Sequence, residues 1–431
     1  MGDKVLETIR DIIWSFPLVL FLMGFGVVLL VCLRKYPILD FRWIWKVTFG
    51  KLNKHSLSVF SLALGGTMGV GNIIGASSCV LLFGAGSLFW MWVSAIVGMV
   101  IKYAEIVIAM HYRKRVNNEF IGGPMVNMEN GLSLRWMAVL YACLCIVTSL
   151  GIGNLVPMNA LVSMVSYHVD VSIWWIVGFS LFMAFILFKG KVLIEKVCLY
   201  MVPLMSILFI GACLGIVLIN IDGLYAVFGS VFSDVFDYKA MFGGAFWMQL
   251  QMGMARGIYS NEAGMGTSSI VHVKGNGVGC EQGAWGILEV CMDTVISCTL
   301  SALVVLLMKD FVEFTDVYQA VYVCFINSFG MFGNVLYMVS MLFFATSGML
   351  AWCYYARECL GYLRVSIRWY SLVFVLVLFF GSLVDTSSLW MLTDIGNGLM
   401  VLLNVSSMFG LCDIVMKSSD KYFNSFGNHV K

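Results

Sequence analysis

The stretch SLALGGTMGVGNIIGASSCVLLF, residues 61–83, combines two properties that conflict in a simple membrane helix. It contains no charged residue, and it is long enough to cross a lipid bilayer. Its centre nevertheless carries five glycines within eleven positions: Gly65, Gly66, Gly69, Gly71 and Gly75. Because each glycine in a helix interior costs about 1 kcal/mol relative to alanine, this segment is predicted to leave helical geometry near the middle of the bilayer.

The composition of the whole chain is that of an integral membrane protein. The 431 residues are 61% hydrophobic and 12% charged, and the mean hydropathy is +0.92, whereas soluble domains are about one quarter charged. The formal net charge of +2 gives no reason to expect a nucleic-acid partner. The 13 cysteines lie mostly within apolar runs and form no CxxC pair, so neither a disulfide framework nor a metal site is predicted from them.

About eleven apolar runs are long enough to span a bilayer, and only helices satisfy their own backbone hydrogen bonds in lipid at these lengths. The first run is not followed by a small-x-small cleavage site and is therefore interpreted as a retained helix rather than a signal peptide. The predicted spans are residues 12–33, 57–83, 87–110, 136–166, 172–188, 197–219, 241–255, 284–308, 332–356, 369–384 and 389–416.

The charges of the loops predict an orientation. Basic residues gather after the first, third, fifth, seventh, ninth and eleventh runs, whereas the loops after the sixth and eighth carry acids such as Asp222 and Asp310. Loops rich in lysine and arginine stay in the cytoplasm. This pattern predicts a multi-pass protein of the plasma membrane, a bacterial inner membrane, with its N-terminus outside and its C-terminus in the cytoplasm.

A second glycine-rich segment, MFGGAFWMQLQMGMARG at residues 241–257, is predicted to be broken as well. With the first helix set aside, the two broken segments are the first and sixth of ten spans, as expected of a five-plus-five inverted repeat. Residues 1–431 are then one transporter domain, with an extra helix at 12–33, a first repeat at 57–219, a second repeat at 236–416 and a cytoplasmic tail at 417–431. The N–H groups freed by such a break suit a carboxylate, and the freed carbonyls suit Na⁺ or an ammonium group.

Two other interpretations of the first glycine cluster stay open. Gly71 and Gly75 form a GxxxG pair, which lets membrane helices pack closely. A phosphate-binding loop is less well supported, because the spacing from Gly69 to Gly75 misses the GxGxxG pattern and no strand precedes it. The density of glycines and the polar Asn72 that follows them favour a ligand site over packing alone.

Six segments of the chain also have a known counterpart. They are GTMGVGNIIGASS (66–78), FWMWVSAIVGMVIKYAEIVIAMHYR (89–113), GGPMVNMENGL (122–132), RGIYSNEAGMGTSSIVH (256–272), WCYYARECLGYL (352–363) and LWMLTDIGNGLM (389–400). In these segments the chain resembles the alanine/glycine:cation symporter family, that is, the sodium:alanine symporters of the amino acid–polyamine–organocation superfamily. The resemblance implies an all-α membrane protein of the leucine-transporter type with one extra N-terminal helix, and Na⁺- or H⁺-coupled uptake of alanine or glycine.

The resemblance also implies where ligands bind. The carbonyls of Gly65 and Met68 would hold Na⁺ together with the hydroxyls of Thr346 and Ser347, which could instead bond back to their own helical turn. The backbone amides of Val70 and Gly71 would take the substrate carboxylate. The full set of implied substrate-binding residues is Thr67, Gly69, Val70, Gly71, Asn72, Asn154, Met241, Gly244, Ala245, Trp247 and Trp352.

The chain departs from the family pattern at four places. Ser347-Gly348 stands where two adjacent hydroxyls are usual, and Pro157 stands where the family has glutamine. Ala356-Arg357-Glu358 replaces Gly-Glu-Arg, and Leu403-Asn404 replaces Pro-Asn. These departures leave open the coupling ion, Na⁺ or H⁺, and the choice among L-alanine, D-alanine, glycine and serine.

Charged residues within the predicted spans are further candidates for functional roles. Lys102 and Glu105 share one helix face and can pair, and Glu289 and Asp293 share another. Asp394 stands near a predicted helix start, where an acid also favours the helix dipole.

Other charged residues fall closer to the predicted ends of the spans. Arg256 and Glu262 are interpreted either as an inner-gate ion pair or as a solvated pair in a loop. The histidines are scattered along the chain, which argues against a metal site or a proton relay. They are His55, His111, His168, His272 and His429.

The sequence thus predicts a secondary active symporter that imports a small neutral amino acid with Na⁺ by alternating access. The alternatives are a proton-coupled permease for small amino acids and a non-transporting amino acid receptor. No HExxH or GxSxG motif supports an enzyme. The expected partners are the amino acid and the lipid bilayer, with no nucleic acid and no obligate protein partner.

Overall fold

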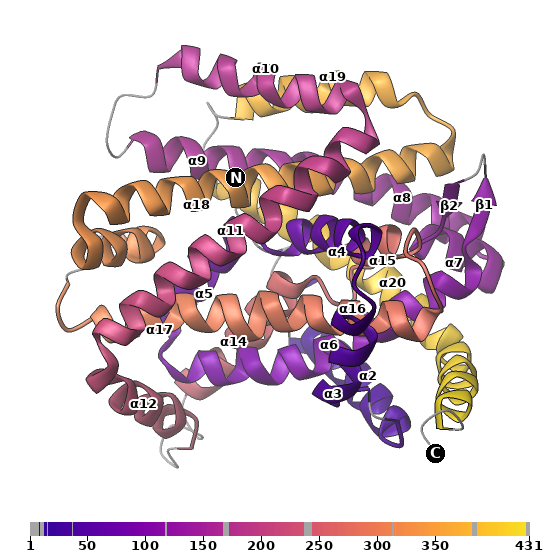
Figure 1. Cartoon of the computed structure of the whole chain (residues 1–431), viewed down its shortest axis with the longest axis horizontal. Helices are drawn as coiled ribbons and strands as arrows, with labels where there is room; N and C mark the ends of the chain where they lie inside the picture. The colour runs from indigo at the N-terminus through magenta and orange to yellow at the C-terminus, as the bar shows by residue number, and fades with distance from the viewer. Residues whose placement is uncertain are drawn as a thin grey trace.

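The chain folds almost entirely into helices, as the sequence predicts (Figure 1). The structure is a computed structural model that describes residues 8, 13–14, 16–36, 38–116, 119–166, 172–236, 244–312, 314, 316–381 and 386–427. Within these residues the β-structure is a short antiparallel hairpin of β1 (Lys114–Val116) and β2 (Glu119–Ile121).

Each predicted apolar run falls on one or more helices, and additional helices lie between the runs. Those before residue 240 are α2 (Phe16–Leu33), α3 (Phe41–Val47), α4 (Lys54–Thr67), α5 (Val70–Phe83), α6 (Gly86–Tyr112), α7 (Pro124–Gly131), α8 (Arg135–Leu150), α9 (Val156–Ser166), α10 (Ile173–Lys189), α11 (Lys191–Ile219) and α12 (Leu224–Phe236). Those after it are α14 (Gly244–Asn261), α15 (Thr267–His272), α16 (Gly279–Val290), α17 (Thr299–Met308), α18 (Ala320–Leu363), α19 (Ile367–Gly381) and α20 (Thr386–Gly427).

Short irregular helical segments join some of these helices. The π-helical segments η2 (Gly151–Leu155) and η4 (Cys291–Cys298) make α8–α9 and α16–α17 continuous. The single-turn segments are η1 (Phe49–Lys51), η3 (Ile221–Gly223) and η5 (Val317–Gln319). A left-handed residue, Gly330 with φ 57°, divides α18 into two helices.

Several of these helices are suited to cross a membrane. Among the described residues, six helical segments are long and apolar enough, and the bent pair α4–α5 would make a seventh crossing. The helices α2, α10 and α19 are apolar but shorter. Each of the eleven predicted runs falls on one of these elements or on α14, so the protein is a multi-pass membrane protein. The number of crossings and the inverted repeat stay predictions.

The second predicted break is wrong over the part of it that the structure describes. The helix α14 is unbroken along its length, and residues 241–243 lie outside the described residues. A methyl group on Gly253 would lie 2.4 Å from the carbonyl oxygen of Ser87, and one on Gly257 would lie 1.9 Å from Oγ of Ser94. The glycines of α14 therefore permit close packing against α6, and the chain leaves helical geometry only after Asn261.

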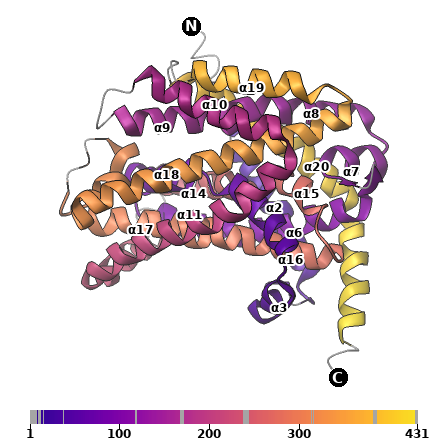
Figure 2. The same ribbon diagram turned by 45° about the horizontal axis from the view of Figure 1, so that its top comes forward.

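Helices that are distant in the sequence enclose the broken pair α4–α5. Figure 2 shows α10 and α19 side by side at one edge of the molecule, where they contact each other. The helix α4 packs against α11 and α18, and α5 packs against α14 and α17. The break between α4 and α5 thus lies inside the bundle, surrounded by protein rather than by lipid.

Four segments that the loop charges assign to one side of the membrane meet at one end of the molecule. Lys191 of α11 lies 2.6 Å from Glu358 of α18, and Lys274 lies 3.1 Å from the same carboxylate and 3.3 Å from Glu119 of the hairpin. The ammonium groups of Lys191 and Lys274 lower the pKa of Glu119 from its ordinary value. These contacts agree with the prediction that the four segments lie on the same side of the membrane. That this side is the cytoplasm stays a prediction.

Candidate functional site

The α4–α5 span is bent by 43° at Met68 and Gly69. The Met68 N–H still donates to the Leu64 carbonyl at 2.7 Å, but the Gly69 N–H turns back to the Thr67 carbonyl at 2.8 Å. Regular helix resumes at Val70, in α5. The break predicted within residues 65–72 is therefore confirmed.

Both helix ends at this break expose main-chain groups. The first N–H groups of α5, on Val70 and Gly71, have no acceptor within their own helix because they precede its first hydrogen bond. On the other side, the carbonyls of Gly65 and Gly66 in the last turn of α4 accept no hydrogen bond from any residue that the structure describes. Uncompensated N–H and C=O groups are costly away from water, so the two ends need partners from outside the helix.

A cavity of about 50 Å³ adjoins the break. Since one water needs roughly 10–15 Å³ by this measure, the space holds about four water-sized groups. Six of the residues predicted to bind substrate line it: Thr67, Gly69, Val70, Gly71, Asn72 and Trp352. The other lining residues are Gly66, Ile152, Val156, Pro157, Tyr259, Ser260, Glu262, Phe344 and Gly348.

Two glycines keep the cavity open. A methyl group on Gly69 or on Gly71 would meet no atom within 4 Å. By contrast, a methyl group on Gly66 would lie 2.0 Å from the hydroxyl oxygen of Tyr355, and one on Gly65 would lie 3.3 Å from Cβ of Ser347. The glycine cluster thus has two roles. Gly65 and Gly66 permit close helix packing, and Gly69 and Gly71 leave space for a ligand.

Of the remaining residues predicted to bind substrate, Asn154 and Trp247 do not line the cavity. Asn154 is buried in η2 and donates to the Phe374 carbonyl at 2.7 Å, one residue beyond Gly153, which packs against Trp352. Met241 lies outside the described residues, and Gly244 and Ala245 begin α14. Trp247 is 53% exposed on the same helix.

Of the four residues predicted to bind a cation, Gly65 and Ser347 are neighbours, Thr346 precedes Ser347 in α18, and Met68 lies at the break. Ser347 is adjacent to Gly65, and its hydroxyl donates to the Phe344 carbonyl at 3.1 Å. The Thr346 hydroxyl donates to the Leu342 carbonyl at 2.6 Å, so both hydroxyls bond to their own helix. Met68 is fully buried at the break. Carbonyl and hydroxyl oxygens are hard donors that fit Na⁺, and no group of histidine, cysteine or acidic side chains in the described residues could hold a different metal.

Asp293 lies next to the cavity on η4 and is fully buried. Asn72 donates to one of its carboxylate oxygens, and the hydroxyls of Ser260 and Thr294 donate to the other at 2.7 and 2.8 Å. Since Asn72 and Ser260 also line the cavity, Asp293 fixes two side chains of the cavity wall.

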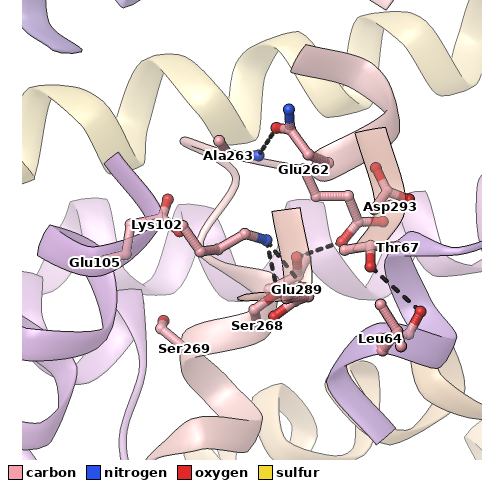
Figure 3. Close-up of polar contacts among 12 residues, drawn as sticks. Leu64, Thr67, Lys102, Glu105, Glu262, Ala263, Ser268, Ser269, Glu289 and Asp293 are labelled. Atoms are coloured by element: carbon pink, nitrogen blue, oxygen red, sulfur yellow. Dashed lines mark hydrogen bonds and ion pairs between the residues drawn. The ribbon is translucent and has the colours of Figure 1, made fainter. Parts of the chain in front are cut away.

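Lys102 pairs across helices rather than along its own helix (Figure 3). Its ammonium group lies 3.2 Å from Glu289 and donates to the Ser268 hydroxyl at 2.7 Å. His272 lies 3.3 Å from the second oxygen of the same Glu289 carboxylate. The predicted ion pair between Lys102 and Glu105 is therefore wrong. The partners of Lys102 are Ser268 of α15 and Glu289 of α16.

The other charged candidates have the following surroundings. Glu105 accepts a hydrogen bond from Asn404 at 2.8 Å, and Asp394 is half-buried and accepts one through its carbonyl from Trp14 at 2.7 Å. Arg256 and Glu262 form no ion pair in the described part of the chain. Arg256 lies beside Gly75 at a second, smaller hollow that shares Gly71, Tyr259 and Ser260 with the cavity.

Two residues of the cavity wall were not predicted to bind substrate: Glu262, which was predicted to be a gate or loop residue, and Ser260, which was not predicted at all. Both lie in SNEAGMG, residues 260–266, and Glu262 was predicted to lie near the cytoplasmic end of a span, whereas the structure places both residues in the cavity wall. The available signal was the pair Gly264 and Gly266, which adopt φ of 89° and 86° and let the chain turn back on itself.

The site can therefore surround a small polar molecule with groups of both electrostatic signs. Helix N–H groups and an amide side chain offer hydrogen-bond donors, and carbonyls and the Glu262 carboxylate offer acceptors. Apolar walls from Ile152, Phe344 and Trp352 limit the ligand's size.

Comparison with known proteins gives matches along nearly the entire chain. The sequence model of the Sodium:alanine symporter family matches residues 1–430. An uncharacterized transporter of Haemophilus influenzae is 32% identical over 98% of this chain and 96% of its own. The sodium/alanine symporter AgcS of Methanococcus maripaludis is also 32% identical, over 98% and 97%. The amino-acid carrier protein AlsT of Bacillus subtilis is 28% identical over 97% and 92%.

Proposed function

Since the chain belongs to the sodium:alanine symporter family, a family of transporters and not of enzymes, we propose that it imports a small neutral amino acid, alanine or glycine, together with Na⁺. Transport proceeds by alternating access in a bacterial inner membrane, through eleven spans that comprise one extra helix and a five-plus-five inverted repeat. The N-terminus lies outside and the C-terminus in the cytoplasm.

The cavity at the α4–α5 break is the observation that supports this proposal most directly. It lies inside the bundle, beside main-chain groups that lack partners in their own helices, and it is about 50 Å³ in volume. A broken helix in the membrane interior is the typical binding site of secondary transporters. The small volume favours alanine and glycine over amino acids with long side chains.

In this proposal the ligands bind at the two helix ends. The N–H groups of Val70 and Gly71 bind the substrate carboxylate, which the positive end of the α5 dipole stabilises. The carbonyls of Gly65 and Met68 bind Na⁺ with the hydroxyls of Thr346 and Ser347, and Trp352 closes the pocket. Proximity of Gly65 to Ser347 supports this cation site.

Uptake of labelled alanine into proteoliposomes tests the proposal. We expect uptake to require an inward Na⁺ gradient and to fall to the protein-free background when choline replaces sodium. Uptake that is equal in choline and follows an inward proton gradient would favour the proton-coupled alternative. If neither alanine nor glycine accumulates under either gradient, while a larger amino acid such as glutamine does, the assigned substrate class is wrong.

A further inference from the structure

The interior around the SNEAGMG loop holds more negative than positive side chains (Figure 3). Four carboxyl groups are buried here, on Glu105, Glu262, Glu289 and Asp293. The buried groups that can carry positive charge among them are Lys102 and His272, and both contact the same carboxylate, Glu289. Among the described residues, the other three acids thus have no cation within ion-pair distance.

These three acids differ in how fully the protein hydrogen-bonds them. Asp293 accepts bonds from three side chains, one amide and two hydroxyls. Glu105 accepts one from the Asn404 amide on Oε1, and its buried Oε2 has no hydrogen-bond partner among the described residues. Glu262 accepts one from the Thr267 hydroxyl, on Oε2 at 2.5 Å, and its Oε1 receives no hydrogen bond from the described residues. A buried carboxylate without a cation is strongly destabilising, so a partner from outside the protein would stabilise the site.

Of the three, only Glu262 lines the cavity at the break. Its side chain is 3% exposed and extends from its loop toward Thr67, another lining residue, as Figure 3 shows. Its backbone is held in the left-handed region at φ 52°, an uncommon conformation for a residue with a side chain. Such strain persists only where the surrounding structure imposes it, and it often marks a functional position.

The cavity therefore has two poles of opposite sign. The N–H groups of Val70 and Gly71 form the positive pole at the start of α5, a helix of 14 residues. The carboxylate of Glu262 forms the negative pole. A space of about 50 Å³ between such poles matches a small zwitterion better than a neutral or singly charged molecule of the same size.

We propose that Glu262 binds the ammonium group of the transported amino acid and thereby restricts transport to compounds that carry both a carboxylate and a charged amine. This inference rests on the proposed function, because it assumes that the cavity is the amino acid site. The ammonium group supplies the cation that Glu262 lacks, through a charge-assisted hydrogen bond to Oε1. Lactate, in which a hydroxyl replaces the ammonium group of alanine, is then a poor ligand.

The test compares two ligands and two variants by isothermal titration calorimetry on the purified full chain in sodium chloride. Wild-type protein is expected to bind alanine at least about 100-fold more tightly than lactate, because the unpaired carboxylate rejects a ligand without the amine. Glu262→Gln keeps the size of the side chain and its bond to Thr267, and it is expected to raise the Kd for alanine about 10- to 100-fold. The Kd for lactate should stay the same or fall.

Glu105→Gln is the matched control. It also neutralises a buried acid that has no cation partner, but Glu105 does not line the cavity. We expect it to change the Kd for alanine less than about threefold. That is well below the tenfold change in Kd that about 1.4 kcal/mol of binding free energy produces. If Glu262→Gln and Glu105→Gln lost the same affinity for alanine, direct contact between Glu262 and the ammonium group would be refuted. The loss would then reflect a general effect of negative charge in the protein interior.

The remaining outcomes separate this inference from the proposed function. If wild-type protein binds neither alanine nor glycine, the proposed function fails. If it binds alanine and lactate equally, or if Glu262→Gln binds alanine as tightly as wild type, the function stands and the ammonium site is refuted. The comparison of alanine with lactate on wild-type protein needs no variant, so it decides the question even if Glu262→Gln fails to fold.

Discussion

Replacing Gly71 with leucine should abolish transport while leaving the protein folded and inserted. A Cβ at this position would meet no atom within 4 Å, because it would enter the cavity. The cavity holds about four water-sized groups at roughly 10–15 Å³ each, and the isobutyl side chain of leucine is about that size. The substituted side chain would therefore occupy the space that the substrate needs. Leucine is also favoured over glycine in a helix by up to about 1 kcal/mol, so α5 should not be destabilised.

The assay is alanine uptake into proteoliposomes, normalised to the amount of inserted protein. We expect Gly71→Leu to reduce uptake at least about 100-fold, the effect of losing roughly 2.8 kcal/mol of binding. Gly211→Leu is the matched control, since Gly211 lies in the membrane helix α11, has equally open surroundings and does not line the cavity. It should transport like wild type.

A smaller substitution at the same position makes the prediction sharper. Gly71→Ala moves one methyl group from the ligand's space to the protein, so glycine should be tolerated better than alanine. One methyl group in a tight pocket changes binding by about 1–3 kcal/mol, so the ratio of alanine to glycine uptake should fall about tenfold or more.

The leucine variant supplies the result that would refute this reasoning. If Gly71→Leu takes up alanine at the wild-type rate, the cavity is not the substrate site.

Three further predictions address the cation site, the packing of α14 and the buried ion pair. Ser347→Ala should raise the Na⁺ concentration for half-maximal uptake about tenfold while changing alanine affinity at saturating Na⁺ little; an unchanged sodium titration would count against this hydroxyl. Gly253→Ala should destabilise the protein by about 1–3 kcal/mol, seen as a lower unfolding temperature in detergent, because the methyl group would overlap backbone on α6; Gly211→Ala should not. Lys102→Met should cost about 3–5 kcal/mol by leaving Glu289 without its lysine, and adding Glu289→Gln should restore most of that loss; equal unfolding temperatures for the single and double variants would show that the loss does not come from the unpaired charge of Glu289.

Hydropathy and glycine spacing predict much of this fold because they are local properties. In the described residues each of the eleven apolar runs falls on helix, and the cluster from Gly65 to Gly71 coincides with the bend at Met68 and Gly69. Both results follow from short segments of sequence, since helix propensity and bilayer thickness act on neighbouring residues.

Glycine density alone does not distinguish a break from a packing surface. The segment from Gly244 to Gly257 is also rich in glycine, but Gly253 and Gly257 lie against α6 and the helix continues through them. Whether a missing side chain admits a ligand or a neighbouring helix depends on what lies opposite, and that is set by residues about 160 positions earlier in the chain, such as Ser94.

The partners of the charged residues could not be predicted from spacing for the same reason. Lys102 and Glu105 are well placed to pair on an isolated helix, yet Lys102 contacts Glu289, which is 187 residues away. Helical spacing limits which residues can meet on one helix, but it gives no information about the residues that a second helix brings closer.

The two interruptions near the cavity contribute different kinds of group, and this difference explains why only one was predictable. The break between α4 and α5 contributes main-chain N–H and C=O groups, whose availability follows directly from where the helix stops. The turn after α14 contributes a side chain, Glu262, whose position depends on left-handed backbone at Glu262, Gly264 and Gly266. Glycine permits such a conformation but does not require it. A site made only from helix ends could bind a carboxylate and a cation but would have no fixed charge to test for the amine. The carboxylate on the turn supplies that test, so the selectivity of the cavity for a zwitterion depends on the element that the sequence pattern alone did not reveal.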